Sequence, residues 1–273
     1  MRPTSLEADL LLPRERALPS GGRVRLRLEK ESGIVGICGP SGSGKTTLIR
    51  ALAGLPPRGT GMVRVDGVPW LDSVRGLDLP LEERPVSYLP QGACLFPHMN
   101  VRENLLFAFS LSEPPRQTRR GWVGSAVLSG IVRFLSGSGK GVLPERVAEL
   151  VERFGIGGLL GKRTGELSGG QAMRVALARS FLKRTRLYLL DEPLTGVDPE
   201  GRALLTREIA ALLRERVAVA VWVTHTPGEL SPVAEDMVVL LPEEGLSERF
   251  DREARQSTGF EAGFGREAPE WRR

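Results

Sequence analysis

The amino-acid sequence predicts an α/β fold, because continuous apolar runs of strand length alternate with segments that carry helix signals. Residues 34–38, 187–190 and 217–223 form such runs, which are typical of strands in a parallel sheet covered on both faces. Asp198 and Pro199 predict the start of a helix between the last two runs. We therefore expect the core to be built on a parallel sheet.

The remaining elements follow from local patterns. Residues 23–29 alternate strictly between charged and apolar side chains, which predicts a half-buried strand with its arginines facing solvent. Further short strands are predicted at 62–67 (strand and turn), 85–89 and 237–241. Helix starts are predicted at Asn100 with Glu103, at Pro144, and at Ser168 with Gln171.

The composition is that of an ordinary soluble protein. The 273 residues suffice for one large domain or two small ones, and 41% hydrophobic with 26% charged residues is an average balance. No apolar run is long enough to span a membrane, and the first residues do not predict a secretory signal, so we expect a cytoplasmic protein. Cys38 lies in an apolar run and is expected to be a buried thiol, without a disulfide or zinc site.

The net charge of +5 and the pI of about 9.7 indicate a basic surface. Such a surface fits nucleic acid or the anionic inner face of a membrane. Aromatic residues make up only 5% of the chain, and no basic stretch is interleaved with them. Nucleic acid is therefore the less favoured partner.

A glycine-rich loop follows the first apolar run, at residues 39–46. Its sequence fits G-x-x-x-x-G-K-[ST], a pattern whose backbone amides wrap nucleotide phosphates. In that pattern Lys45 reaches the β- and γ-phosphates and Thr46 ligates magnesium. The helix expected from Thr46 to Gly54 adds its positive N-terminal end. A strand-to-helix turn without a ligand is the alternative, and a dinucleotide motif fails because its third glycine is missing.

Two carboxylates follow the run 187–190. Asp191 and Glu192 stand at the end of a buried strand, where ligands collect in open α/β sheets. Alone, this pair fits an ordinary polar turn equally well. Together with Lys45, it predicts a magnesium site at Asp191, reached through water, and a general base at Glu192 that polarises the attacking water.

With these motifs and the segment Leu167–Gln171, the chain resembles the ATP-binding subunits of ABC transporters. Residues 167–171 match that family's signature without a substitution, and the resemblance covers about residues 20–241. Gln91 occupies the position of the lid glutamine, which touches magnesium and the transmembrane partner. Residues 194–198 occupy the position of the family's D-loop, and His225 occupies the position of its switch histidine. When the resemblance to the family is set aside, His225 is more typical of a packed loop residue, and Ser168 is typical of a simple helix cap.

The resemblance implies a P-loop NTPase (RecA-like) core with an antiparallel β subdomain and an α-helical signature subdomain. It also implies ATP and Mg²⁺ as cofactors, bound in a head-to-tail dimer between Lys45 of one subunit and Ser168 of the other. Implied catalytic residues are Glu192, His225 and Gln91, and implied metal contacts are Thr46, Gln91 and Asp191. Implied nucleotide contacts are Gly39, Pro40, Ser41, Gly42, Ser43, Gly44, Lys45, Thr46, Thr47, Ser168, Gly169, Gly170, Gln171 and Asp198.

The chain departs from the family pattern at two places. Family members commonly stack adenine on an aromatic residue upstream of the first buried strand, but no aromatic residue precedes Trp70. The guanidinium of Arg14 or Arg16 is the hypothetical replacement. Residues 195–197 differ mildly from the usual D-loop sequence and leave Asp198 in place.

Residues 88–106 resemble importers of inorganic anions, most of all the molybdate/tungstate group. The resemblance implies transport coupled to ATP hydrolysis at the cytoplasmic face of the membrane, with transmembrane permease subunits and, indirectly, a substrate-binding protein as partners. Sulfate, ferric iron and polyamines are the alternative substrates. Phe96, Pro97 and His98 would line the groove for the permease, although Phe96 equally fits a buried position in the helical subdomain.

The domain boundaries expected from these features are 1–241 for the ATPase domain, with a helical subdomain at about 92–182. An insert at 112–142 combines an apolar thread with flanking basic residues, which fits a contact with the membrane subunit or the lipid surface, and equally a surface loop that covers itself. The tail 242–273 is charged and expected to be flexible, without a regulatory β-domain.

Two other functions compete with transport. A soluble ABC ATPase acting on nucleic acid or ribosomes usually has two cassettes or long coiled-coil inserts, and this chain has neither. A regulator that binds ATP without turnover is disfavoured because Glu192 and His225 are both present.

Overall fold

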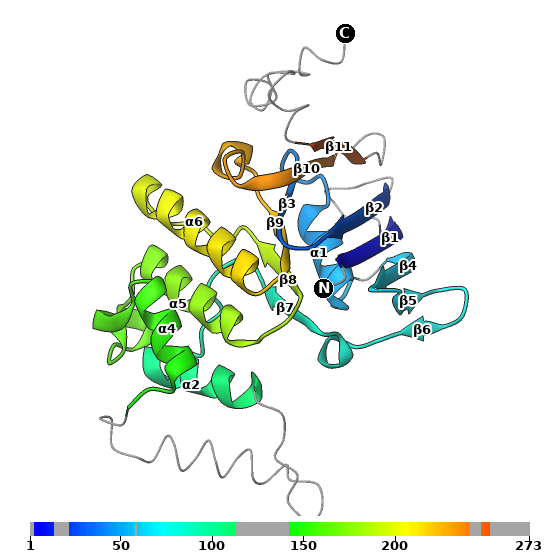
Figure 1. Cartoon of the computed structure of the whole chain (residues 1–273). Helices are drawn as coiled ribbons and strands as arrows, with labels where there is room; N and C mark the ends of the chain where they lie inside the picture. Colours follow the sequence, from blue (N-terminus) through cyan, green and yellow to red (C-terminus); the bar gives the residue numbers. More distant parts are fainter. Residues whose placement is uncertain (1–2, 14–21, 58, 113–141, 241–246, 252–273) are drawn as a thin grey trace, which may run out of the picture. The chain divides into compact units, whose positions relative to one another are not determined.

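The computed structural model describes residues 3–13, 22–57, 59–112, 142–240 and 247–251. These residues form two compact units (Figure 1). The first contains the described residues within 1–88, 185–192 and 202–273, and the second contains those within 89–184 and 193–201.

An antiparallel sheet forms one part of the first unit, with strand order β2-β1-β4-β5-β6. Its strands are β1 (Thr4–Leu12), β2 (Gly22–Lys30), β4 (Thr60–Val65), β5 (Val68–Asp72) and β6 (Leu77–Asp78). Strand β1 pairs with two neighbours at once: Leu6 lies opposite Leu28 of β2 and opposite Val65 of β4. Apolar side chains alternate along β1 and β2, so one face of this sheet is buried.

The second sheet has the order β11-β10-β3-β9-β8-β7. Its strands are β3 (Gly33–Cys38), β7 (Val86–Leu89), β8 (Leu187–Asp191), β9 (Val219–Val223), β10 (Ala234–Leu240) and β11 (Ser247–Asp251). Strands β10, β3, β9 and β8 run parallel, and β11 is antiparallel to β10. All residues of β3, β8 and β9 are buried, which is why these segments are continuously apolar.

Helix α1 (Lys45–Ala53) is part of a hydrophobic core that it shares with both sheets. The helix contacts β1, β8 and β9. Leu48, Ile49 and Leu52 of α1 are fully buried in this core. Because β3 leads through the glycine loop directly into α1, packing of the helix fixes the loop at the carboxyl end of the parallel strands.

Helices dominate the second unit. They are α2 (Val101–Ser112), α4 (Glu145–Arg153) and α5 (Gly169–Leu182), with short 3-10 turns η2 (Gly157–Leu159) and η3 (Thr164–Glu166). The three helices contact one another, and the rings of Phe154 and Phe181 lie 6.0 Å apart. Helix α6 (Pro199–Glu215) begins in this unit and continues in the first.

Capping interactions predicted from the sequence are present. Glu103 N donates to Asn100 Oδ1 at 2.8 Å, and Asn100 N donates to Glu103 Oε2 at 2.8 Å. Asp198 Oδ2 accepts from Gly201 N at 2.8 Å at the start of α6. These bonds satisfy backbone amides that have no partner inside their helices.

Every strand predicted from the sequence is found, and several details differ. Strands β1, β5 and β6 are not predicted, and in β1 the run Leu10–Leu12 obscures the alternation of the residues before it. Strand β10 begins at Ala234, three residues before its predicted start. Strand β9 begins at Val219, since Val217 has a left-handed backbone with φ 51°. Pro144 is the cap of α4 and not a helical residue. Residues 247–251, expected to be flexible, pair with β10 as β11.

Several other expectations lie outside the described residues. They concern Arg14 and Arg16, most of the insert 112–142 (residues 113–141) and most of the tail. Within the described ranges, none of the helices combines the length and hydrophobicity needed to span a bilayer.

Arg84, next to the 3-10 turn η1 (Leu81–Glu83), is a buried cation that ties α1 to the antiparallel sheet. Its guanidinium donates to Leu52 O at 2.6 Å, to Leu79 O at 2.8 Å and to Asp78 Oδ1 at 3.2 Å. It also lies 5.6 Å from the ring centroid of Trp70. The carbonyl groups at the C-terminus of α1 therefore find their partner in a positive charge, as the helix dipole favours.

We expect Arg84→Met to lower the free energy of unfolding by about 3 kcal/mol, because it leaves buried carbonyl groups without donors. Urea unfolding measures the change. Arg75→Met is the matched control: Arg75 pairs with Asp72 at 3.6 Å but its side chain is 73% exposed. That control should change the free energy by less than about 0.5 kcal/mol. Equal effects of the two variants would contradict the role given to Arg84.

Candidate functional site

The glycine loop connects β3 to α1 through residues with unusual backbone angles. Gly42 and Gly44 have φ of 83° and 88°, which disfavour other residues. A Cβ atom on Gly39 would lie 2.4 Å from Leu240 O. The first backbone bond of the helix runs from Leu48 N to Gly44 O at 2.8 Å, so the amides before it lie outside the helical ladder. Such amides are suited to bind phosphate.

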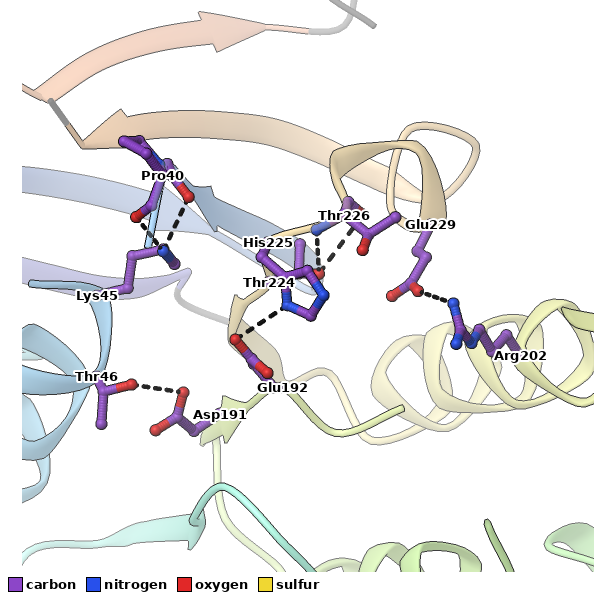
Figure 2. A network of polar contacts seen from close by, with 11 residues as sticks. Pro40, Lys45, Thr46, Asp191, Glu192, Arg202, Thr224, His225, Thr226 and Glu229 are labelled. Carbon is purple, nitrogen blue, oxygen red and sulfur yellow. Dashed lines mark hydrogen bonds and ion pairs between the residues drawn. The ribbon is translucent and has the colours of Figure 1, made fainter. Parts of the chain in front are cut away.

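Lys45 is held by the loop itself. Its Nζ donates to Gly39 O and to Pro40 O, each at 2.8 Å (Figure 2). Burial lowers the pKa of the Lys45 ammonium below its ordinary value, while the negative charges of Glu192 and Asp191 act in the opposite direction. The ammonium is thus oriented by two neutral acceptors, which an anionic ligand can replace with a stronger partner.

Asp191 and Thr46 meet at the end of β8. Thr46 Oγ1 donates to Asp191 Oδ1 at 3.3 Å (Figure 2). The Asp191 side chain is fully buried, and this burial raises its pKa to about 6. The hydrogen bond from Thr46 lowers this pKa in part, and the charge of Glu192 raises it further. An acidic group with so high a pKa is a common feature of functional sites.

Glu192 and His225 form the third part of the site. His225 Nδ1 lies 3.1 Å from Glu192 Oε1. Glu192 has a left-handed backbone with φ 49°, and its amide donates to Val223 O at 2.9 Å. The His225 side chain is 57% exposed, while that of Glu192 is 17% exposed. The carboxylate is therefore held at the strand end, and the imidazole reaches it from a more open turn.

Two buried polar atoms of this site have no hydrogen-bond partner within the described part of the chain. They are Ser43 Oγ and Asp191 Oδ2. Buried polar atoms are rarely left unsatisfied, so these two point to a ligand. A carboxylate oxygen beside a threonine hydroxyl is the donor set that Mg²⁺ prefers, and the loop amides suit the phosphates that accompany it. These residues fit a magnesium nucleotide.

The signature segment lies in the second unit, at the start of α5. Gln171 N donates to Ser168 Oγ at 3.3 Å, and Ser168 N donates to Gln171 Oε1 at 3.2 Å. The side chain of Gln171 is thus used in the cap, while the hydroxyl proton of Ser168 remains available. Ser168 and Gly169 are exposed. A Cβ atom on Gly170 would lie 3.0 Å from Gly196 O, so this glycine allows close packing of segment 194–198.

The loop 91–100 of the second unit is exposed at Gln91, Pro97 and His98, whereas Phe96 is half-buried. Asn104 and Arg179 hold this loop. Asn104 Oδ1 accepts from Phe96 N at 2.9 Å, and the Arg179 guanidinium donates to Cys94 O at 2.7 Å. Arg179 also lies 5.3 Å from the ring centroid of Phe96.

The structure brings the loop 39–47 together with Asp191, Glu192 and His225 in the first unit. The other predicted site residues, Gln91, Ser168–Gln171 and Asp198, belong to the second unit. The contacts around His225 are not predicted from the sequence. Thr224 Oγ1 accepts from Thr226 N at 2.9 Å, and Arg202 Nη1 contacts Glu229 Oε1 at 2.7 Å. No sequence signal marks an arginine and a glutamate that are distant in a chain rich in both.

A family model described as "ABC transporter" matches residues 23–195, and the fold, the glycine loop and the strand-end carboxylates agree with it. The chain belongs to the ABC transporter family, and its fold is that of the ATP-binding cassette. Two solved structures support the fold. A dimeric ATP-binding cassette in a post-hydrolysis state with ADP and Pi has a TM-score of 0.66 at 22% identity, covering 91% of this chain and 98% of that one. A bacterial ABC exporter with ATP bound has a TM-score of 0.68 at 16% identity, covering 96% of this chain and 41% of that one.

Among curated proteins, the chain is similar to import ATP-binding proteins. A protein of Albidiferax ferrireducens named "Molybdenum import ATP-binding protein ModC" is 36% identical, over 79% of this chain and 52% of the relative. A protein of the same name from Pseudomonas savastanoi is 35% identical, over 77% of this chain and 51% of the relative. The "Fe(3+) ions import ATP-binding protein FbpC" of Pseudomonas fluorescens is 35% identical, over 75% of this chain and 50% of the relative. The chain spans about half the length of these relatives.

The raised pKa of Asp191 predicts how stability depends on pH. Because its folded-state pKa of about 6 exceeds the ordinary 3.8, the ionised group opposes folding above pH 6, and this penalty disappears as the pH falls to about 4. Without nucleotide or magnesium, Asp191→Asn should raise the free energy of unfolding by about 1–3 kcal/mol at about pH 7.5. Urea unfolding at about pH 7.5 and at about pH 4 measures this difference in the free energy of unfolding. A variant less stable than the original at the higher pH would contradict the expectation.

Proposed function

We propose that this chain is the ATP-hydrolysing subunit of an ABC importer. The observation that carries the proposal is the cluster of Lys45, Thr46, Asp191, Glu192 and His225 at the ends of the parallel strands. Its cation, hydroxyl, carboxylates and imidazole are those that phosphoryl transfer to water requires.

The roles of the residues follow from their positions. The amides of residues 39–47 and the ammonium of Lys45 bind the β- and γ-phosphates. Thr46 and Asp191 would hold magnesium, which would supply positive charge to balance that of the phosphates. Gln91 as a further metal contact stays a prediction from the sequence. Glu192 orients the attacking water and accepts its proton, and His225 supports the γ-phosphate through its contact with Glu192.

The site is completed by a second copy of the chain. Ser168, Gly169 and Gly170 are exposed or half-exposed at the N-terminus of α5, where a hydroxyl proton and helix amides are suited to an anion. In a head-to-tail dimer these groups contact the γ-phosphate held by Lys45 of the partner copy. Asp198 belongs to segment 194–198, which packs against Gly170, and so lies beside the proposed phosphate contact. Gln171 acts indirectly, because its capping hydrogen bonds fix Ser168.

The transported substrate is an inorganic oxyanion, with molybdate or tungstate favoured. This part of the proposal is supported by the relatives named for molybdenum import, and the relative named for Fe(3+) import supports ferric iron as the second candidate. The loop with Phe96, Pro97 and His98 docks a transmembrane permease, which places the chain at the cytoplasmic face of the membrane. A substrate-binding protein delivers the oxyanion to that permease.

Uptake measurements test the substrate. Deleting the gene for this chain in its source organism should reduce molybdate uptake, with sulfate and ferric iron uptake as comparisons. The original gene should restore uptake, and the Lys45→Met variant should not. Loss of iron uptake alone would replace the oxyanion with ferric iron. Unchanged uptake of all three would reject the importer proposal for these substrates.

The composite site predicts a complementation between two inactive variants. Lys45→Met removes the phosphate contact from both sites of its dimer, and Ser168→Arg removes the signature contact from both. An equal mixture forms mixed dimers with one intact site, so it should recover about a quarter of the original ATPase rate. Phosphate release measures the rate. If the mixture stays as inactive as each variant alone, the head-to-tail arrangement is wrong.

Removing the proposed general base should separate binding from hydrolysis. Glu192→Gln keeps the shape of the side chain and should slow hydrolysis by about 10²–10³-fold, while ATP and Mg²⁺ still bring two copies together. Phosphate release and light scattering after size exclusion measure the two properties. Hydrolysis at the original rate would remove Glu192 from this role.

A further inference from the structure

The turn that carries His225 connects β9 to β10 and contains the short turn η4 (Pro227–Glu229). Its first residue is anchored on the sheet, because Thr224 N donates to Ile37 O at 3.0 Å. Thr224 Oγ1 then accepts from Thr226 N at 2.9 Å, which closes a local turn around His225. These bonds fix the entry of the turn.

The exit of the turn is fixed by an ion pair with another element. Glu229 Oε1 lies 2.7 Å from Arg202 Nη1 of α6 (Figure 2). The Glu229 side chain is 15% exposed and that of Arg202 is 36% exposed. A short, partly buried contact between full charges is stronger than the usual surface pair. It joins residues 27 positions apart, so it orients the turn relative to α6.

His225 depends on this backbone. Its imidazole is more than half exposed, and its only side-chain partner among the described residues is Glu192. Few packing contacts are therefore available to orient the ring, and the position of the turn determines whether Nδ1 meets the carboxylate.

We propose that Arg202 and Glu229 are positioning residues that hold His225 against Glu192 for the hydrolytic step. The inference rests on the proposed function of the same site. Neither residue is placed in contact with nucleotide. Their effect is therefore on the geometry of the imidazole, and catalysis is sensitive to displacements of about 1 Å in such groups.

Steady-state kinetics of the full chain tests this role. Arg202→Met and Glu229→Gln should each lower kcat about 5- to 30-fold and leave the KM for ATP within about twofold. Exchanging the charges in the double variant Arg202→Glu with Glu229→Arg should recover a large part of kcat. In a His225→Ala background, Arg202→Met should cause no further loss, because it acts through the missing imidazole.

The matched control is Arg186→Met. Arg186 contacts Asp66 at 3.4 Å in the same unit and is 41% exposed, but it lies away from the turn. It should leave kcat unchanged. A loss of kcat equal to that of Arg202→Met, or an additive loss in the His225→Ala background, would show a general structural effect and overturn the proposal.

A second measurement does not depend on activity. The chain has two histidines, His98 and His225, so ¹⁵N-histidine labelling gives two imidazole signals, of which His98 is an internal control. Arg202→Met should shift the signal of His225 and leave that of His98 unchanged. If the original protein does not hydrolyse ATP, the proposed function fails, and this spectrum still tests the positioning. An unmoved His225 signal overturns the inference by itself.

Discussion

Opposite charges buried at the carboxyl ends of the parallel strands are the constraint on which the rest of the first unit depends. Lys45 and Asp191 are both buried, and each departs from its ordinary pKa in the direction that favours the neutral form. A protein tolerates such groups only where neighbours hold them, here the carbonyl groups of the glycine loop and the hydroxyl of Thr46. The surrounding core, with α1 packed between the two sheets, keeps these partners in place.

Rigid and open parts of the site have different physical origins. Glu192 stands directly after a buried strand, and its backbone is fixed by a bond to β9. His225 stands on a turn that is anchored by the sheet at one end and by an ion pair at the other. A charge pair responds to solvent and to neighbouring charges more than packing does. The imidazole is therefore the part of the site whose position is most easily changed.

The elements that sequence analysis predicted well carry local signals. The continuous runs of β3, β8 and β9, the capping pairs at Asn100 and Ser168, and the glycine loop are each legible within a few residues. The rest depends on contacts between distant residues. The alternation of β1 indicates a strand only once its pairing with β2 and β4 is known, and β11 forms because β10 has an edge free for pairing. Likewise, the sequence around Arg84, Arg202 and Glu229 contains no pattern that indicates their partners.

Strand order has a consequence for how the protein can be divided. The segment that matches the family model, residues 23–195, excludes β1, which lies between β2 and β4, and β9, which lies between β3 and β8. A fragment cut at these limits would lose β1 from the first sheet and β9, β10 and β11 from the second, and it would expose the backbone groups of four strands that are paired in the whole chain. The stretch that identifies the family is thus not a unit that can fold, and such a fragment would be prone to aggregate.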